Sequence, residues 1–190
     1  MSISFENKLI HPDDMQAFIT DLKPGHVWIW NCTTTNDDRT KILEALGSML
    51  SKHPNTKMLT ISKFSLSDQD LMILDNSHAF DHLLYLDLSF NHISNNGAGM
   101  LFEGHPHLVE VNMLNNQIGN GVADTILSFI AKSNSEVMIR IGGLMDEKHE
   151  REIMTAIQRH TEVIKNDRTE FMKHMNYVNA FKTKYFDDHK

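Results

Sequence analysis

Apolar and polar residues alternate over two short stretches near the middle of the chain. Residues 83–93 fit the pattern L-x-x-L-x-L-x-x-N-x-L at every fixed position. Residues 108–118 repeat it 25 residues further along, with Leu, Val, Met, Asn and Ile in the same places. Because side chains of a strand point alternately to its two faces, Leu86 and Leu88 are expected to point into a core while Tyr85 points outward. Each stretch therefore predicts a short strand with one buried face.

A helix is predicted after each of these strands. Residues 94–102 and 119–127 both begin with polar residues that can cap a helix, continue with small residues and then carry an apolar stripe. The chain therefore repeats a unit in which a strand is followed by a helix.

This unit resembles the leucine-rich repeat of the ribonuclease-inhibitor-like subclass, and the chain is similar to the compact repeat domain of tropomodulins. The resemblance implies an α/β fold, a right-handed solenoid with parallel strands on the concave face, helices on the convex face and a C-terminal helical cap. It also implies that Asn91 and Asn116 are buried at the turn after each strand. There the side-chain amide would hydrogen-bond backbone groups that the bend leaves unpaired.

Weaker copies of the unit extend the array in both directions. Residues 58–66 carry the apolar pattern, but Phe64 replaces the turn asparagine, so that turn must be satisfied differently. Residues 137–141 end in two glycines, and we expect the helix after them to be missing or altered. Near the N-terminus, residues 3–5 and 12–19 are typical of a strand and its helix. We expect about five to six units within residues 1–143.

The apolar run at residues 27–32 fits two registers. If Val27 points inward, Trp28 and Trp30 lie on the concave face and Cys32 takes the turn position, where the resembled subclass accepts Cys as well as Asn. A shift by one residue exchanges the two faces and buries both tryptophans instead. The sequence leaves the two registers open.

Residues 144–190 contain neither glycine nor proline and form a C-terminal cap or extension. A first helix is predicted from Asp146 and Glu147, with an apolar stripe that covers the open end of the solenoid. A second helix is predicted from residue 166 onward, rich in Phe, Tyr and Met, and it either caps, projects to a partner or dimerises. Its apolar positions are Phe171, Met175, Val178, Phe181 and Tyr185.

The composition narrows the classes of partner. A formal net charge of −7 disfavours nucleic acids and anionic membranes, which require clustered Lys and Arg. A single cysteine forbids an internal disulfide and suits a reducing compartment, and no segment has the apolar length of a membrane span. We therefore expect a cytoplasmic protein with a protein partner.

The titratable residues do not form a recognised catalytic or metal-binding motif. His78 and His82 are four residues apart, which would place them on one face of a helix, but no third ligand follows at a suitable spacing. A solvated helix face is the preferred interpretation. Cys32 is predicted to be buried, which raises the pKa of a thiol and lowers its reactivity. We expect no enzyme, no cofactor and no metal site.

The resulting functional prediction is a protein-interaction module that binds on its concave face, because large aromatic residues flanked by charges are typical of binding hot spots. A first alternative is a regulator of a partner GTPase that acts through Arg39 or Arg140, since related repeat proteins activate GTPases. A second is a bacterial effector delivered into a eukaryotic host, suggested by a eukaryote-like repeat in a composition typical of AT-rich genomes. The predicted contact residues are Trp28, Trp30, Thr60, Ser62, Tyr85, Asp87, Ser89, Glu110, Asn112 and Arg140.

Overall fold

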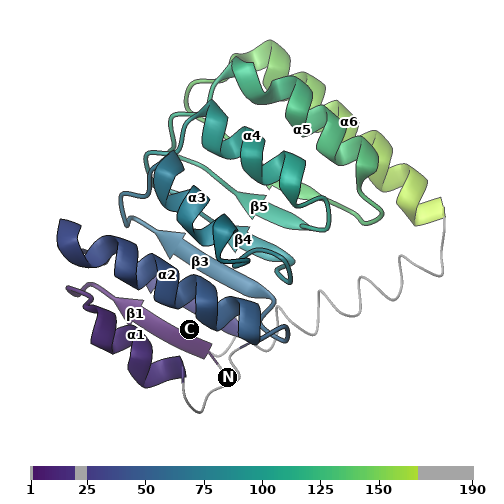
Figure 1. Cartoon of the computed structure of the whole chain (residues 1–190). Coiled ribbons are helices and arrows are strands. Elements are labelled where there is room, and N and C mark those ends of the chain that lie inside the picture. The colour runs from purple at the N-terminus through teal and green to yellow at the C-terminus, as the bar shows by residue number, and fades with distance from the viewer. Residues whose placement is uncertain (1, 20–24, 167–190) are drawn as a thin grey trace.

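The computed structural model describes residues 2–19 and 25–166, which form an alternation of strands and helices. The strands all run parallel in one six-stranded sheet whose order follows the chain from β1 to β6. The described helices stack along the other layer, so the molecule is a curved two-layer solenoid (Figure 1). The elements in order are β1 Ser2–Glu6, α1 Pro12–Ile19, β2 His26–Trp30, α2 Asn36–Lys52, β3 Met58–Ser62, α3 Asp68–Asn76, β4 Tyr85–Asp87, α4 Asn95–Gly104, β5 Glu110–Asn112, the 3-10 turn η1 Asn120–Val122, α5 Ala123–Lys132, β6 Met138–Arg140 and α6 Glu147–Asn166.

The strand register aligns one apolar residue of every strand in a single buried row. These residues are Ile3, Val27, Leu59, Leu86, Val111 and Ile139. Together with the apolar faces of the helices they belong to one continuous hydrophobic cluster that runs through all the units. The predicted hydrophobic spine and the leucine-rich-repeat fold class are therefore confirmed.

The register also decides between the two interpretations of the tryptophan strand. Val27 and Ile29 are buried in the core, and Trp28 pairs in register with Thr60 on the opposite face of the sheet. Trp30 pairs with Ser62 in the same way. Both tryptophans therefore lie on the concave face, and Cys32 is buried at the turn position.

The helix starts are linked from one unit to the next. The Asp68 carboxylate accepts hydrogen bonds from the backbone N–H and the hydroxyl of Ser94, the residue that caps α4. The Asn95 side chain in turn accepts from the backbone N–H of Gly119, and the Asn120 side chain accepts from the backbone N–H of Asp146. These bonds satisfy backbone donors that a helix start leaves unpaired, and they also hold adjacent units together.

The helix predicted from Asp146 and Glu147 is present after β6 as α6, so this unit does not lack a helix, and α6, with 20 residues, is longer than the other described helices. α6 packs against α5 and occupies the convex layer as the other helices do (Figure 1). Ile153 is buried, and Ile157, His160 and Ile164 are half-buried along the predicted stripe. The division of the chain at residue 143 stays a prediction, and the second predicted helix, with Phe171, Met175, Val178, Phe181 and Tyr185, lies outside the described residues.

Candidate binding surface on the concave face

Asn91 holds the turn that follows β4. Its amide nitrogen donates to the carbonyl of Leu88 at 2.9 Å and to that of Ile61 in the preceding unit at 2.7 Å. Its amide oxygen accepts from the backbone N–H groups of Phe64 at 3.1 Å and Leu66 at 2.9 Å. The side chain is buried and satisfies backbone groups of two units at once.

Asn116 repeats this arrangement one unit further along. Its amide nitrogen donates to the carbonyls of Met113 and Leu88, and its oxygen accepts from the backbone N–H of Ile93. The Leu88 carbonyl accepts from both turn asparagines at 2.9 Å. The two asparagines therefore form a continuous ladder of bonds that fixes the curvature beneath the concave face.

The turn after β3, where Phe64 occupies the asparagine position, is completed by Arg39 from α2. One guanidinium nitrogen of Arg39 donates to the carbonyls of Phe64 and Ser65, and the group also forms a bidentate ion pair with Asp70 at 2.9 and 3.0 Å. The guanidinium carbon lies 5.2 Å from the centre of the Phe64 ring. Arg39 is therefore engaged in holding the fold. Its role as a GTPase-activating arginine stays a prediction.

Asp70 serves both this ion pair and the start of α3. Its carboxylate accepts from the backbone N–H and the hydroxyl of Ser67, which completes a capping box. Burial raises the pKa of the Asp70 carboxyl, but hydrogen bonds from Arg39 and Ser67 outweigh burial and hold this pKa below its ordinary value of 3.8. The carboxylate form is thus part of the folded structure.

Cys32 occupies the equivalent place after β2. It is buried, and its thiol donates to the carbonyl of Trp30 with Sγ and O 3.4 Å apart. This contact places Cys32 in the turn that ends the tryptophan strand.

Two of the predicted contact residues, Asp87 and Asn112, use their side chains to hydrogen-bond groups at the strand ends. The Asp87 carboxylate accepts from the backbone N–H of Ser89 at 2.9 Å and from the side-chain amide of Asn112 at 2.9 Å. Asn112 accepts from the backbone N–H of Leu114. Both side chains are half-buried, so substitution of Asp87 must also change the stability of the fold.

Three further predicted contact residues are buried, which corrects the expectation that every outward-facing position is exposed. The hydroxyl groups of Ser62 and Ser89 form a hydrogen bond with their oxygens 3.1 Å apart, and both residues are buried. Tyr85 is only 4% exposed and packs with Met58 in a small apolar cluster outside the main core. Alternation along a strand decides which face a side chain takes, whereas its exposure depends on what packs on that face.

The remaining predicted contacts form the accessible part of the concave row. Trp28, Trp30 and Thr60 are half-buried. Arg140, on β6, is half-exposed and lies 3.6 Å from the Glu110 carboxylate on β5. One guanidinium group, two indole rings and one hydroxyl group are thus partly exposed along this row.

A lysine between two aromatic rings marks the edge of the concave face where the strands end. The Lys63 ammonium lies 5.0 Å from the centre of the Trp30 ring and 5.2 Å from the centre of the Phe90 ring. We call Trp30, Lys63 and Phe90 the aromatic–lysine stack. Phe90 is 49% exposed, and Leu114, which follows β5 near this edge, is 36% exposed.

Phe90 has a backbone conformation that is unfavourable for a bulky residue. Its φ is 58°, in the left-handed region, which costs an L-residue other than glycine about 1–2 kcal/mol. The residue just before the turn position is left-handed in every unit, and three units place an asparagine there, which tolerates this conformation better. The column consists of Asn7, Asn31, Lys63, Phe90, Asn115 and Gly143.

Sequence reasoning missed Lys63 and Phe90 because the repeat pattern treats their position as variable. The signal was present in the asparagines of the other units, which indicate a left-handed residue at this place. A phenylalanine at this position departs from the asparagine of three other units, because a left-handed backbone is unfavourable for a bulky side chain. Backbone strain of this kind is concentrated at functional sites.

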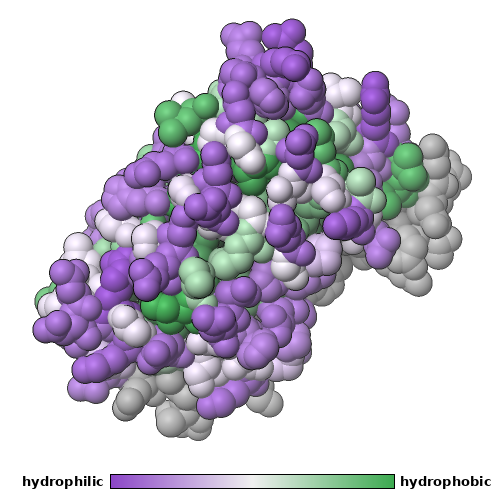
Figure 2. Space-filling view, turned by 45° about the horizontal axis from the view of Figure 1, so that its top comes forward, coloured by the Kyte–Doolittle hydropathy of each residue, from purple (hydrophilic) through white to green (hydrophobic). Residues whose placement is uncertain are grey.

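Among the residues whose side chains the structure describes, the convex face carries no comparable cluster of rings. Figure 2 shows a surface on which hydrophilic residues predominate and apolar residues form small separate patches. Met72 on α3 and Met154 on α6 are each about half exposed, on different helices. The concave edge is therefore the better candidate for a specific contact.

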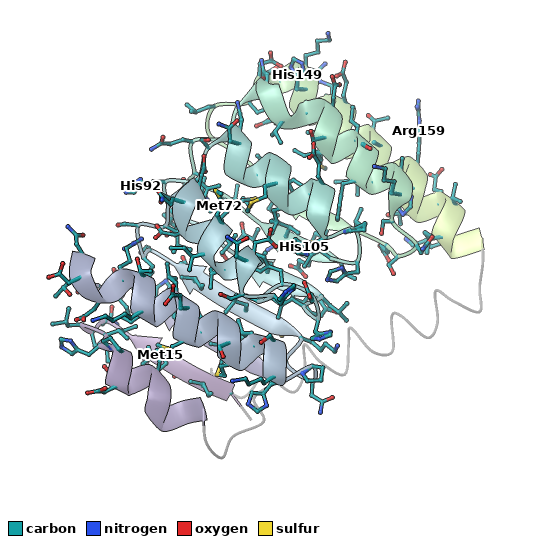
Figure 3. All side chains as sticks on the ribbon, viewed as in Figure 1. Met15, Met72, His92, His105, His149 and Arg159 are labelled. Carbon is teal, nitrogen blue, oxygen red and sulfur yellow. The ribbon has the colours of Figure 1, made fainter. Side chains whose placement is uncertain are left out.

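The histidines of the described residues are dispersed over the fold. α3 ends at Asn76, so His78 and His82 lie in a turn and not on the predicted helix face. Nε2 of His105 lies 2.8 Å from the Asp75 carboxylate, near the edge where the strands begin (Figure 3). Within residues 2–19 and 25–166, no three His, Cys, Asp or Glu side chains are grouped so that they could hold a metal ion. Likewise, no helix of the described chain is long and apolar enough to cross a membrane.

Comparisons with known proteins agree with this architecture. Residues 82–102 match a family model described as a leucine-rich repeat. A Caenorhabditis elegans tropomodulin C-terminal domain is similar in structure, with a TM-score of 0.55 and 14% identity over 88% of this chain and 87% of that chain. Leiomodin-1 actin-binding site 2 is similar with a TM-score of 0.54 and 13% identity over 76% of this chain and 82% of that one. No curated protein sequence matches the chain. The chain thus has the leucine-rich-repeat fold, and its solenoid is similar in structure to the tropomodulin and leiomodin-1 domains.

Proposed function

We propose that the protein binds a protein partner through the strand-end half of its concave face, with the aromatic–lysine stack at the centre of the contact. The observation that carries this proposal is the half-exposed Phe90 ring on a left-handed backbone, held beside Trp30 by the Lys63 ammonium. Aromatic residues dominate the energetics of protein interfaces, and a ring that is already positioned loses little conformational entropy on binding.

The neighbouring side chains provide the polar surroundings of such a contact. Arg140 is half-exposed on β6, and Thr60 lies in register beside Trp28. An apolar centre surrounded by polar residues is the usual anatomy of a protein interface. The surface is thus suited to an apolar side chain of a partner with acidic or hydrogen-bonding groups around it.

The similarity to leiomodin-1 actin-binding site 2 makes monomeric actin the first defined probe. The proposal includes a cytoplasmic location and a non-enzymatic role. Delivery into a eukaryotic host as a bacterial effector remains an alternative. Of the two arginines considered for a GTPase regulator, Arg140 alone remains exposed, and a turnover assay with Arg140→Ala addresses that alternative.

The test compares two charge reversals in the full chain. Lys63→Glu removes both cation–ring contacts, whereas Lys132→Glu changes the same charge on an exposed residue of the convex helix α5. We expect Lys63→Glu to weaken binding to actin, or to the partner that the wild-type protein captures from a eukaryotic lysate, by at least about tenfold. Lys132→Glu should bind as the wild type does. Equal binding by wild type and Lys63→Glu would contradict the proposal.

A further inference from the structure

The half of the concave face where the strands begin differs from the aromatic–lysine stack. His26, Met58 and Tyr85 pair in register on β2, β3 and β4, and they are 1%, 5% and 4% exposed. We call these three residues the strand-start cluster. Its apolar members contact Leu84 and are separate from the hydrophobic core on the other face of the sheet.

No described helix covers this cluster, because the described helices occupy the convex layer (Figure 1). Parallel sheets are ordinarily covered on both faces. Large side chains this inaccessible therefore require a covering element on the concave side. The rest of the chain offers one segment of sufficient length.

Residues 167–190 have the sequence of an amphipathic helix. Phe171, Met175, Val178, Phe181 and Tyr185 follow one another at spacings of 4, 3, 3 and 4, which is one helical face. Twenty-four residues would form a helix about 36 Å long, whereas six strands span roughly 24 Å from the first to the last. The segment is long enough to cross the whole sheet.

The C-terminal end of α6 lies near the edge of the sheet where the strands begin, from which residues 167–190 could cross the concave face. Nε2 of His160, in the second half of α6, lies 3.0 Å from the carbonyl oxygen of Ser135, shortly before β6 begins. The chain therefore leaves α6 beside the strand starts. A segment that continues from there meets the strand-start cluster before it meets the aromatic–lysine stack.

The charges of the segment and of the sheet are complementary. Residues 171–186 contain three lysines and no aspartate or glutamate. On the strand-start half, Glu110 lies in register with Tyr85 and contributes a carboxylate that a basic helix faces favourably, with Arg140 3.6 Å away on its other side.

We propose that residues 171–186 dock as a helix on the strand-start half of the concave face of their own chain, over Met58 and Tyr85. The bound segment leaves the aromatic–lysine stack accessible and borders it. Whatever the partner is, a segment docked there regulates access to the strand-end half of the concave face, and this regulation rests on the proposed function. A partner that needs the whole concave width has to displace it.

The test uses Trp28 as the reporter in the full chain. The protein has two tryptophans, so Trp30→Phe leaves Trp28 alone, and the Trp28 ring lies 5.6 Å from the ring of His26 in the cluster. In this background Phe171→Asp with Val178→Asp places two charges in the apolar stripe. Thr169→Asp with Asn176→Asp adds the same charge at the same spacing on the opposite side of the predicted helix.

Fluorescence quenching by iodide at constant ionic strength then reports the exposure of Trp28. Loss of two buried apolar side chains should shift the docked-to-free ratio of the segment at least about tenfold, so quenching should increase in the Phe171/Val178 variant. The Thr169/Asn176 variant should quench as the parent does. Equal quenching in the two double variants, or a parent already quenched as freely as tryptophan in solution, would overturn the proposal.

Two controls keep the outcome unambiguous. Both variants should keep a cooperative thermal transition, because the proposed docking site lies outside the solenoid core. If the Phe171/Val178 variant does not melt cooperatively, the quenching comparison is made with Val178→Asp alone, and the same results support or overturn the proposal. Light scattering over a dilution series separates self-docking from exchange between chains. Protection of Trp28 that disappears as a dimer dissociates would show that a second copy is the occupant, and it would overturn the proposal.

Discussion

The turns after β3 and β4 meet the same requirement with different side chains. After β4, Asn91 from the turn itself donates to the carbonyls of Leu88 and Ser89, and Asn116 from the following unit accepts from the backbone N–H of Ile93. After β3, Phe64 cannot do so, and Arg39 from α2 and Asn91 from the following unit bind its backbone instead. The strands on either side remain in register. A repeat can therefore lose its turn asparagine when its neighbours supply the bonds.

The β3 unit, which lacks a turn asparagine, thus depends on its neighbours, whereas the regular β4 unit also supports the unit before it. Arg39 is 25 residues from Phe64 and 31 from Asp70 in the sequence. Such a substitute cannot be recognised from a local repeat pattern. It also predicts an order of effects, because Asn91 serves two turns and Arg39 serves one.

The largest loss of stability is expected from Asn91→Ala. The substitution leaves the N–H groups of Phe64 and Leu66 and the Ile61 carbonyl without their buried partner. We expect the free energy of unfolding, measured by urea denaturation, to fall by about 4 kcal/mol. A loss below about 1 kcal/mol, as for a surface substitution, would show that the asparagine ladder does not hold the turns.

A smaller loss is expected from Arg39→Ala. Its side chain is 22% exposed, so solvent compensates part of the broken ion pair and of the lost bonds to the turn. We expect the free energy of unfolding in urea to fall by about 2 kcal/mol. For Arg39→Lys, which keeps the charge but not the bidentate geometry, we expect about half of that loss. If Arg39→Ala proves as damaging as Asn91→Ala, the proposed difference between the two turns is wrong.

The Arg39 turn should also respond to acid. The lowered pKa of Asp70 means that its carboxylate stabilises the fold above the pKa of the unfolded chain, about 3.9, and that this contribution is lost as pH falls through the still lower folded value. Thermal melts between pH 5 and pH 2 should therefore fall less steeply for Asp70→Asn than for the wild type. If the melting temperatures of the two proteins fall equally with pH, Asp70 does not contribute to the loss of stability in acid.

Much of the fold follows from the sequence because it rests on local spacing. Leu86, Leu88, Val111 and Met113 lie in the predicted core, and the Asn91 and Asn116 side chains lie at the turns. The register of Trp28 stayed open because an apolar strand pattern has no polar face to orient it. Pairing of Trp28 with Thr60 decided it.

The binding surface was less predictable, because exposure and strain arise from contacts between units. Tyr85 faces the predicted side but is buried beside Met58. Asp87 faces the predicted side but binds Asn112 and the backbone of Ser89. Phe90 attracted no prediction, because its importance depends on a backbone angle that the repeat pattern does not encode.

The smallest effect on stability is expected at this residue. Phe90→Asn relieves roughly 1–2 kcal/mol of left-handed strain and loses about 0.5–1 kcal/mol of contact with Lys63. The free energy of unfolding should therefore stay constant or rise by up to about 1 kcal/mol. A clear loss of stability would show that the ring supports the fold and is not held for a partner.

Binding by the same Phe90→Asn protein tests the central claim most directly. If the aromatic–lysine stack is the centre of the interface, binding to monomeric actin, or to the partner captured by the wild-type protein, falls at least about tenfold while the melting temperature does not decrease. Unchanged binding by the variant would contradict the assignment of the strand-end half of the concave face as the binding surface.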